Sequence, residues 1–381
     1  PPIMGASAFV MSEMLGIPYN ELILVAIIPA AFHYLATLCM VHFEARRLGL
    51  KGMPSSEIPR FSDVMARHWH QTIPLVVMVT LLLMQFTPFM AAFWGIILTV
   101  GCSYIPLILK PFGFDKLDHE SVLTPKRLAS SLEEGAKQSI AITAACACVG
   151  FLLGVTTLTG LGFKFSGAIV GLATSFGAAL TPYIPFDLLS QGDITLFMAL
   201  IFVSMACILM GAGIPTTPTY IILASIVAPA LDEFGIALLA SHFFIFYYGV
   251  LADVTPPVAL AAYAGAGIAG SPPMKTGVTA FRLSMGKALV PFMIIYAPSL
   301  LFLDFNIVEF SLALTSGILC ILALSSAYIG HFNGPIQKYE KVVLTIAGLA
   351  LVGHQPWLIA IAGSVVIFIL GRNFRVARYA H

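Results

Sequence analysis

Long apolar runs separated by short polar stretches dominate the pattern along the chain. A helix needs about 20 apolar residues to cross a bilayer, so runs of this length predict membrane spans. Residues 124–137 predict an amphipathic helix on the surface. Residues 342–370 are interrupted by His354-Gln-Pro356 and predict a shallow hairpin that returns to the side it left. The predicted spans and half-spans are residues 21–42, 72–85, 88–109, 139–158, 194–211, 219–231, 236–270, 286–303 and 308–329.

Composition supports this picture, since 59% of the 381 residues are hydrophobic and only 10% are charged. An average soluble chain is about 25% charged, so this chain has too few charged side chains to cover a soluble surface. The formal net charge of +1 gives no reason to expect a nucleic-acid partner. The six cysteines are scattered without a Cys-x-x-Cys pair and are expected to be small buried side chains. We therefore expect an all-α polytopic membrane protein, and we exclude soluble enzymes, disordered chains and disulfide scaffolds.

Charged residues sort into two sets of loops. Lys and Arg gather around residues 46–67, 110–137, 275–282 and 338–341, whereas Asp and Glu gather near residues 13–21, 187–193, 232–233 and 304–309. Positive residues mark the cytoplasmic side, so the acidic loops are predicted to face out. This sorting requires residues 194–231 to form a re-entrant hairpin that enters and leaves from the outside. It also requires residues 236–270 to cross once despite a Pro-Pro break.

Two segments resemble each other and predict an internal repeat. Pro1-Pro-Ile-Met-Gly-Ala-Ser-Ala-Phe9 matches the pattern of Pro256-Pro-Val-Ala-Leu-Ala-Ala-Tyr-Ala264. Downstream, Ala26-Ile-Ile-Pro29 with Tyr34 matches Ala288-Leu-Val-Pro291 with Tyr296 in its internal spacing. The charge sorting gives the two segments opposite orientations, which is typical of inverted-repeat transporters that bind substrate where discontinuous helices meet. The expected divisions are the end of the first repeat (1–42), a cytoplasmic arm with a helix pair (43–138), the second repeat (139–304) and a C-terminal span with a hairpin (305–381). Because Pro1 lies inside apolar sequence, we expect this to be the C-terminal part of a longer chain, without the first repeat's hairpin.

The strongest candidate site is Met210-Gly-Ala-Gly-Ile-Pro-Thr-Thr-Pro-Thr219. Two glycines and two prolines cannot continue a helix, so backbone carbonyls are freed there, and three threonines add hydroxyl oxygens. Such an oxygen-rich turn suits a hard cation such as Na+. The alternative is a proline-kinked turn in a bundle core.

A second break, Leu251-Ala-Asp-Val-Thr-Pro-Pro257, faces the first as its predicted counterpart. Asp253 lies well inside an apolar segment, where a carboxylate is costly unless it is paired, so a functional role is the default hypothesis. The alternative is a carboxylate that only braces the break by accepting hydrogen bonds from freed amides. His33 and His242 are expected to be core histidines bonded to backbone carbonyls.

The run Gly211-Ala-Gly-Ile-Pro-Thr-Thr217, His242 and Tyr247-x-Gly-Val-Leu-Ala-Asp-Val-Thr-Pro-Pro-Val-Ala-Leu-Ala261 resembles the large membrane subunit of TRAP transporters, most closely the fused permease that works with TAXI-type receptors. The resemblance implies an elevator-type importer of a small organic acid anion, with Na+ as coupling ion, no other cofactor and no catalytic residues. It implies a periplasmic receptor and a small-subunit-like membrane region as partners, and the cytoplasmic membrane of a bacterium or archaeon as location.

The same resemblance implies the site residues. The implied cation-binding residues are Gly211, Gly213, Thr216, Thr217, Asp253, Val254, Thr255 and Pro256. The implied substrate-binding residues are Pro1, Pro2, Gly5, Thr217 and Pro257. Without the first hairpin, half of the expected shell is absent, so this part alone should not transport. Receptor-independent carboxylate transporters remain an alternative, and channels or intramembrane enzymes are less favoured ones, because neither pore-lining polar stripes nor a paired nucleophile and base are found.

Overall fold

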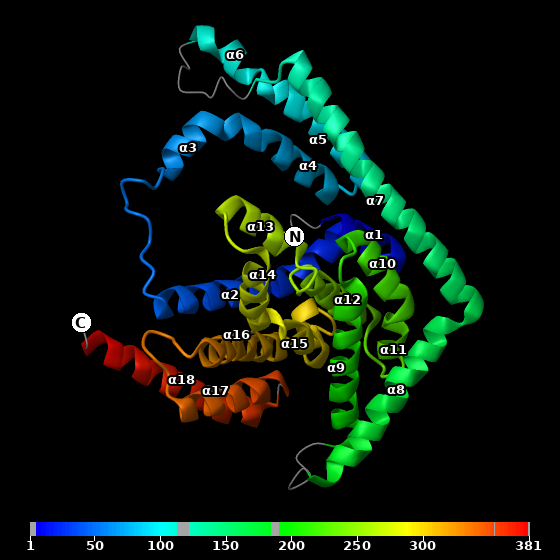
Figure 1. Cartoon of the computed structure of the whole chain (residues 1–381), viewed down its shortest axis with the longest axis vertical. Coiled ribbons are helices and arrows are strands. Elements are labelled where there is room, and N and C mark those ends of the chain that lie inside the picture. Colours follow the sequence, from blue (N-terminus) through cyan, green and yellow to red (C-terminus); the bar gives the residue numbers. More distant parts are fainter. Residues whose placement is uncertain (1–4, 113–121, 184–189, 354, 380–381) are drawn as a thin grey trace. The chain divides into compact units, whose positions relative to one another are not determined.

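The computed structural model describes residues 5–112, 122–183, 190–353 and 355–379, whose regular secondary structure is entirely helical (Figure 1). Within these ranges, seven helices are long and apolar enough to cross a membrane. The chain is therefore an all-α, multi-pass membrane protein, as predicted. The seven are Tyr19–Arg47, Pro88–Leu109, Leu161–Tyr183, Gln191–Gly211, Pro273–Tyr296, Ile307–Ile329 and Pro356–Arg375.

The chain forms two compact units. Unit 1 comprises Pro1–Met11, Val25–Leu50 and Ala145–His381, and unit 2 comprises Ser12–Leu24 and Lys51–Ala144. The two units are defined by how compactly their segments pack, whereas the four divisions expected from the sequence are defined by the internal repeat. The units therefore do not test the four divisions, which stay a prediction. Three helices have residues in both units, namely α1 (Gly5–Leu15), α2 (Tyr19–Arg47) and α7 (Pro125–Thr159).

Unit 2 is built around a pair of packed apolar helices that turn at residues 84–87. Pro88 is the first residue of the second helix, and the Thr87 hydroxyl accepts a hydrogen bond from the Met90 amide at 3.3 Å, which caps that helix. The first helix of the pair has 11 residues, which is too short to cross a membrane by itself and agrees with a half-span at residues 72–85. The helices of unit 2 are α3 (Phe61–His68), η1 (Trp69–Thr72), α4 (Ile73–Leu83), α5 (Pro88–Ser103), α6 (Ile105–Leu109) and η2 (Lys110–Phe112).

Unit 1 contains the predicted hairpin, the predicted broken helix and the C-terminal helices. Helix α9 packs on both α8 and α12, and α16 packs on α17. Leu200, Val203, Phe244 and Ile245 are fully buried in this packing. The helices are α8 (Leu161–Leu180), η4 (Thr181–Tyr183), α9 (Gln191–Gly211), α10 (Thr216–Ile226), α11 (Ala228–Asp232), α12 (Leu238–Ala252), α13 (Leu260–Ala269), α14 (Pro273–Ser284), η6 (Met285–Lys287), α15 (Val290–Tyr296), η7 (Pro298–Leu301), α16 (Ile307–Ile329), α17 (Lys338–Ala350), η8 (Leu351–Gly353) and α18 (Pro356–Tyr379).

Polar residues at the helix ends explain where several of these helices begin and stop. Ser190 and Asp193 form a capping box at the start of α9, where each side chain accepts from the other's backbone amide. The Asn306 carboxamide accepts from the Val308 amide at 2.9 Å and caps α16. Gly330, with φ +76°, ends the same helix in the left-handed conformation that glycine adopts without a steric penalty.

Two features of unit 1 depart from the sequence prediction. The sequence pattern predicts no span at residues 161–180, yet these residues form the apolar helix α8 alongside α9, where a Cβ built on Gly177 would come within 2.2 Å of the Thr195 hydroxyl. The span predicted at residues 286–303 is broken into short helices, because Pro291 and Pro298 supply no backbone amide to a continuous helix.

Helix α7 also departs from the prediction. The surface helix expected at residues 124–137 and the span expected at 139–158 are one continuous helix of 35 residues. At the C-terminus, by contrast, the predicted interruption of residues 342–370 is confirmed, since α17 and η8 end before α18 begins at Pro356, while His354 lies outside the described residues. Helix α18 is long enough to cross a membrane, whereas a shallow hairpin needs only helices that are too short to cross it.

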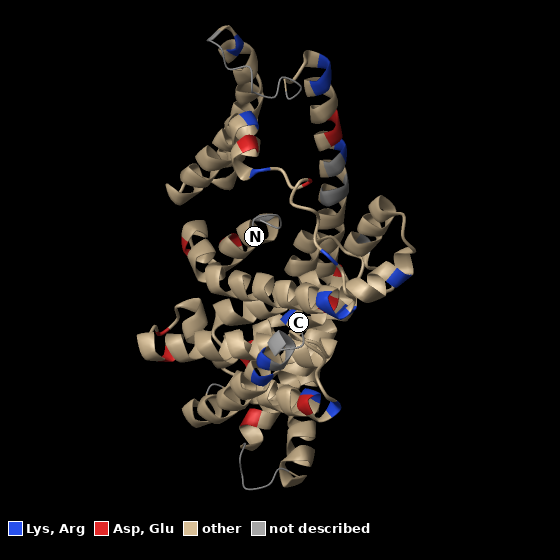
Figure 2. Ribbon diagram, turned by 90° about the vertical axis from the view of Figure 1, so that its left-hand side faces the viewer, with Lys and Arg blue, Asp and Glu red and all other residues tan. Residues whose placement is uncertain are grey.

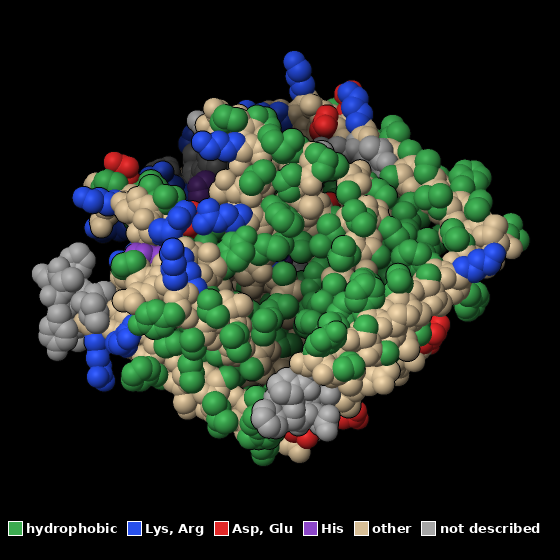
Figure 3. Space-filling model, turned by 60° about the horizontal axis from the view of Figure 1, so that its bottom comes forward, with side chains coloured by type: hydrophobic (Ala, Val, Ile, Leu, Met, Phe, Trp, Pro, Cys, Tyr) green, Lys and Arg blue, Asp and Glu red, His purple; other side chains and the backbone are tan. Residues whose placement is uncertain are grey.

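Hydrophobic side chains cover most of the face shown in Figure 3, and charged side chains lie at its margins. Large exposed apolar side chains occur on many helices, including Leu158 and Phe163, which are 89% and 81% exposed. An aqueous solvent would disfavour such a surface, whereas lipid chains accommodate it.

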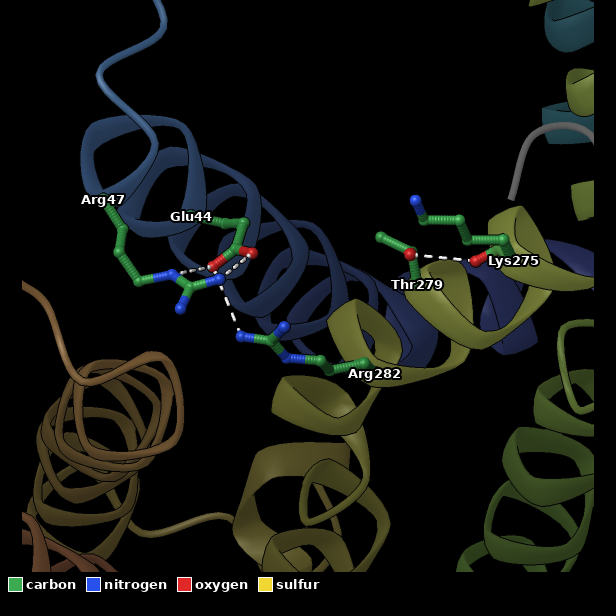
Figure 4. Close-up of polar contacts among 5 residues, drawn as sticks. All are labelled: Glu44, Arg47, Lys275, Thr279 and Arg282. Atoms are coloured by element: carbon green, nitrogen blue, oxygen red, sulfur yellow. Dashed lines mark hydrogen bonds and ion pairs between the residues drawn. The ribbon is translucent and has the colours of Figure 1, made fainter. Parts of the chain in front are cut away.

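Charges in unit 1 gather near helix ends (Figure 2). At the end of α2, Glu44 binds Arg47 at 2.6 Å and Arg282 of α14 at 3.4 Å (Figure 4). Arg46 donates to Asn333 in the loop after α16. The basic ends of α2 and α14 therefore lie near the C-terminal end of α16, whereas Asp304 and Glu309 lie near its beginning. This grouping agrees with the predicted sorting of charges, and the side of the membrane stays a prediction.

Cysteine labelling tests the sidedness. In a cysteine-less background, Ser55→Cys and Ser130→Cys should stay silent to an impermeant thiol reagent added outside intact cells, and Asp232→Cys should react. All three positions are exposed. Labelling of the first two would overturn the positive-inside assignment. A silent Asp232→Cys that reacts only after the cells are opened would show that α8 crosses the membrane and that the hairpin opens on the cytoplasmic side.

Candidate functional site

The predicted hairpin turn is confirmed at residues 212–215. Helix α9 ends at Gly211 and α10 begins at Thr216. Gly213 has φ +79°, a conformation that residues with a Cβ rarely adopt, and the Ile214 amide donates to the Gly211 carbonyl at 3.3 Å. Pro215 precedes the first turn of α10. The turn therefore follows from its glycines and prolines, as expected.

The predicted break at residues 253–259 separates α12 from α13. The amides of Asp253 and Thr255 donate to the carbonyls of Val250 and Ala252, so the last turn of α12 stays closed. The Thr255 hydroxyl donates to the Leu251 carbonyl at 2.9 Å. Since this bond uses the hydroxyl hydrogen, the lone pairs of the Thr255 oxygen stay available to a cation.

The hairpin turn and the broken helix touch directly. A Cβ built on Gly211 would lie 3.0 Å from the Ala252 Cβ and 3.2 Å from the Gly249 carbonyl oxygen. A Cβ built on Gly213 would lie 2.9 Å from a methyl carbon of Val258. Only glycine allows backbones to approach this closely, so the glycines both form the turn and bring it against the break.

Helix α1 contributes a residue that the sequence analysis did not select. The Ser7 hydroxyl is fully buried and lies 3.4 Å from the Thr217 hydroxyl of the hairpin, within hydrogen-bonding range. The repeat pattern was the available signal, because Ser7 lies in the segment that matches residues 256–264. Of the expected substrate residues at this end, Gly5 is the first residue of α1, and Pro1 and Pro2 lie outside the described residues.

The remaining predicted residues divide by environment. Thr216 and Thr217 begin α10 and are partly buried, as are Val254, Thr255 and Pro256 in the break. Pro257 is exposed, and its carbonyl accepts from the Tyr263 hydroxyl at 2.6 Å. The hairpin and break thus place hydroxyl and carbonyl oxygens on facing backbones, which is the donor set that a hard cation requires.

Asp253 has a different neighbourhood from the threonines. It lines a cavity of about 310 Å³ between α2 and α12, together with His33 and Lys287. The backbone amides of Asp253, Val254 and Thr255 all donate to carbonyls of α12. None of these three amides is free to donate to the Asp253 carboxylate, so they do not support the bracing role.

The two membrane histidines have side-chain rather than carbonyl partners. The His242 Nδ1 atom hydrogen-bonds the Tyr220 hydroxyl at 2.6 Å, and both side chains are buried. His33 packs its ring against Tyr34 and Tyr247. The prediction that His242 bonds a backbone carbonyl is wrong, because α10 brings the Tyr220 hydroxyl to it from 22 residues away.

Residues 1–308 match a family described as "Tripartite ATP-independent periplasmic transporter, DctM component". The match covers the hairpin, the broken helix and helix α1, and it ends within α16. No curated protein matches the chain. No solved structure matches it either.

Proposed function

The chain belongs to the DctM component family of tripartite ATP-independent periplasmic transporters, and from that premise we propose that it is the permease of a Na+-coupled, receptor-dependent importer of a small organic acid anion. The coarser function, that of a TRAP-type secondary transporter's membrane subunit, follows from family membership. Membership points to transport rather than to catalysis.

The contact between the hairpin turn and the broken helix carries the Na+ proposal. Gly211 and Gly213 approach Ala252 and Val258 closely, and Thr217 and Thr255 supply hydroxyl oxygens on the two sides. Freed carbonyls and hydroxyls supply oxygens to a dehydrated cation without burying net charge. Discontinuous helices serve this purpose in transporters of several folds.

The proposed partners follow from the family. TRAP DctM components work with a periplasmic binding protein and a small membrane subunit. We extend this to a TAXI-type receptor and to the cytoplasmic membrane of a bacterium or archaeon, because of the motifs at residues 211–217 and 247–261. The inverted repeat and an elevator-type movement belong to the same proposal, supported by the pattern shared between residues 1–9 and 256–264.

Two threonine replacements test the cation site. In the full-length permease, Thr217→Val and Thr255→Val should each raise the Na+ concentration for half-maximal uptake, by about tenfold, because each removes one oxygen ligand with little change in side-chain volume. Uptake of labelled substrate into proteoliposomes over a Na+ series measures this.

Thr276→Val is the matched control, because its hydroxyl bonds Ser271 and the Pro272 carbonyl away from the hairpin. Its Na+ dependence should equal that of the unmodified protein. Unchanged half-saturation in both site variants would mean that the turn is structural only and that the Na+ proposal fails.

A further inference from the structure

The cavity between α2 and α12 adjoins the contact between hairpin and break, because Asp253 and Val254 of the break are among its lining residues. Its walls are mostly apolar and include Phe243, Phe246 and Val250 of α12 with Ala26 and Ala30 of α2. Tyr247 donates to the Pro29 carbonyl at 2.5 Å and so ties α12 to α2 at the cavity wall. The volume, about 310 Å³, is at the lower end of the range for small-molecule sites.

Two opposite charges reach this cavity without meeting. Lys287 comes from η6, and Asp253 comes from the end of α12. Neither takes part in an ion pair or a side-chain hydrogen bond within the described part of the chain. His33 lies within electrostatic reach of Lys287.

An unpaired lysine in a membrane-spanning segment needs an explanation. Lys287 lies within Pro273–Tyr296, one of the seven candidate spans, and it is partly buried. Ionised groups inside membrane spans are costly unless a partner satisfies them, and they mark substrate or ion pathways. Retaining both charges in one apolar cavity therefore indicates a ligand that satisfies them.

We propose that this cavity binds a small 2-hydroxy carboxylate, whose carboxylate pairs with Lys287 and whose hydroxyl donates to Asp253. Lysine offers only donors and matches a carboxylate, whereas an ionised aspartate offers only acceptors and matches a hydroxyl. The apolar walls receive an aliphatic body. The inference rests on the proposed transport of an organic acid anion and names the chemistry of that anion. The hydroxyl is chosen over an ammonium group because an amino acid with an aliphatic side chain, which the apolar walls would require, carries no net charge.

Binding of four matched probes to the purified full-length protein tests this, by the shift in thermal unfolding. The probes are 2-hydroxy-4-methylpentanoate, 4-methylpentanoate without the hydroxyl, 2-hydroxy-4-methylpentanamide without the charge, and leucine with an ammonium group. The hydroxy acid should bind most tightly. Loss of the hydroxyl should weaken binding several-fold, and loss of the carboxylate charge should weaken it by about tenfold or more, because charge-assisted hydrogen bonds are the stronger ones.

Variants assign the two contacts. Lys287→Met should weaken the hydroxy acid by about tenfold or more, and Lys287→Arg should restore most of the affinity because it keeps the charge. Asp253→Ala, which leaves no side-chain acceptor, should remove most of the difference between the hydroxy acid and its deoxy analogue. Lys275→Met, a surface control outside the cavity, should bind all probes as the unmodified protein does.

Three results would overturn the inference. The first is that no probe stabilises the unmodified protein. The second is that the hydroxy acid binds Lys287→Met as tightly as the unmodified protein, and the third is that leucine binds more tightly than the hydroxy acid. Stabilisation by Na+ without any probe is measured in parallel on the same samples. If Na+ stabilises Lys287→Met normally, the protein is folded and the cation site stands independently of this cavity. If the hydroxy acid binds but Na+ has no effect, the Na+ proposal fails and the cavity assignment stands.

Discussion

Gly213→Ala should destabilise the hairpin by about 3 kcal/mol and abolish stabilisation by Na+. A side chain at φ +79° costs about 1–2 kcal/mol, and a Cβ 2.9 Å from the Val258 methyl carbon adds an overpacking penalty of about 1–3 kcal/mol. Both penalties fall where the turn meets the broken helix, so relief requires the two backbones to separate. Thermal unfolding of the purified protein, with and without Na+, measures both effects.

Gly235→Ala is the matched control for this prediction. Gly235 has φ +72°, close to that of Gly213, but a Cβ built on it would meet nothing within 4 Å. It should therefore lose only the conformational part, about 1–2 kcal/mol, and keep the response to Na+. If the two variants behaved alike, the close approach of Gly213 to Val258 would have no energetic role.

Tyr220→Phe should cost about 1–3 kcal/mol of stability, because it leaves the buried Nδ1 atom of His242 without a partner. Tyr220 is 1% exposed and His242 is 5% exposed, so water cannot replace the lost hydroxyl. The bond joins α10 of the hairpin to α12, so its loss should also loosen the hairpin. Thermal unfolding and protease sensitivity at residues 212–215 measure these effects.

Two controls separate the hydrogen bond from general disturbance. Tyr263→Phe removes a hydroxyl that bonds the exposed Pro257 carbonyl, which water can satisfy, so it should cost less than about 0.5 kcal/mol. Tyr220→Phe combined with His242→Leu removes both polar partners and should be less destabilising than the sum of the two single changes. Additive losses would show that the two side chains act separately.

Local chemistry made much of this architecture readable from the sequence. Gly211, Gly213 and Pro215 lie within five residues and together disfavour a helix by their own backbone properties, and the turn lies where they predict it. The break after Ala252 follows in the same way from Pro256 and Pro257. The scarcity of charged residues fixed the membrane class, because no folding arrangement can cover a soluble surface with so few.

The hydrophobic pattern does not reveal helix α8, and this too has a physical reason. Glycines, threonines and Lys164 make it one of the two least apolar of the seven candidate spans, and the other, Pro273–Tyr296, was also misassigned. A segment of lower hydrophobicity is harder to recognise as a span from its sequence alone.

Tertiary structure alone decided which polar and charged side chains come together. Ser7 lies against Thr217 across 210 positions, and Tyr220 reaches His242 across 22. Lys287 and Asp253 share a cavity although their segments carry no common pattern. The sequence by itself determined where the hairpin turn and the break lie, because a cluster of glycines and prolines acts on its own backbone. Packing between helices that are distant along the chain decides which turns and breaks face each other and which charges share one cavity. Only the folded structure shows this packing.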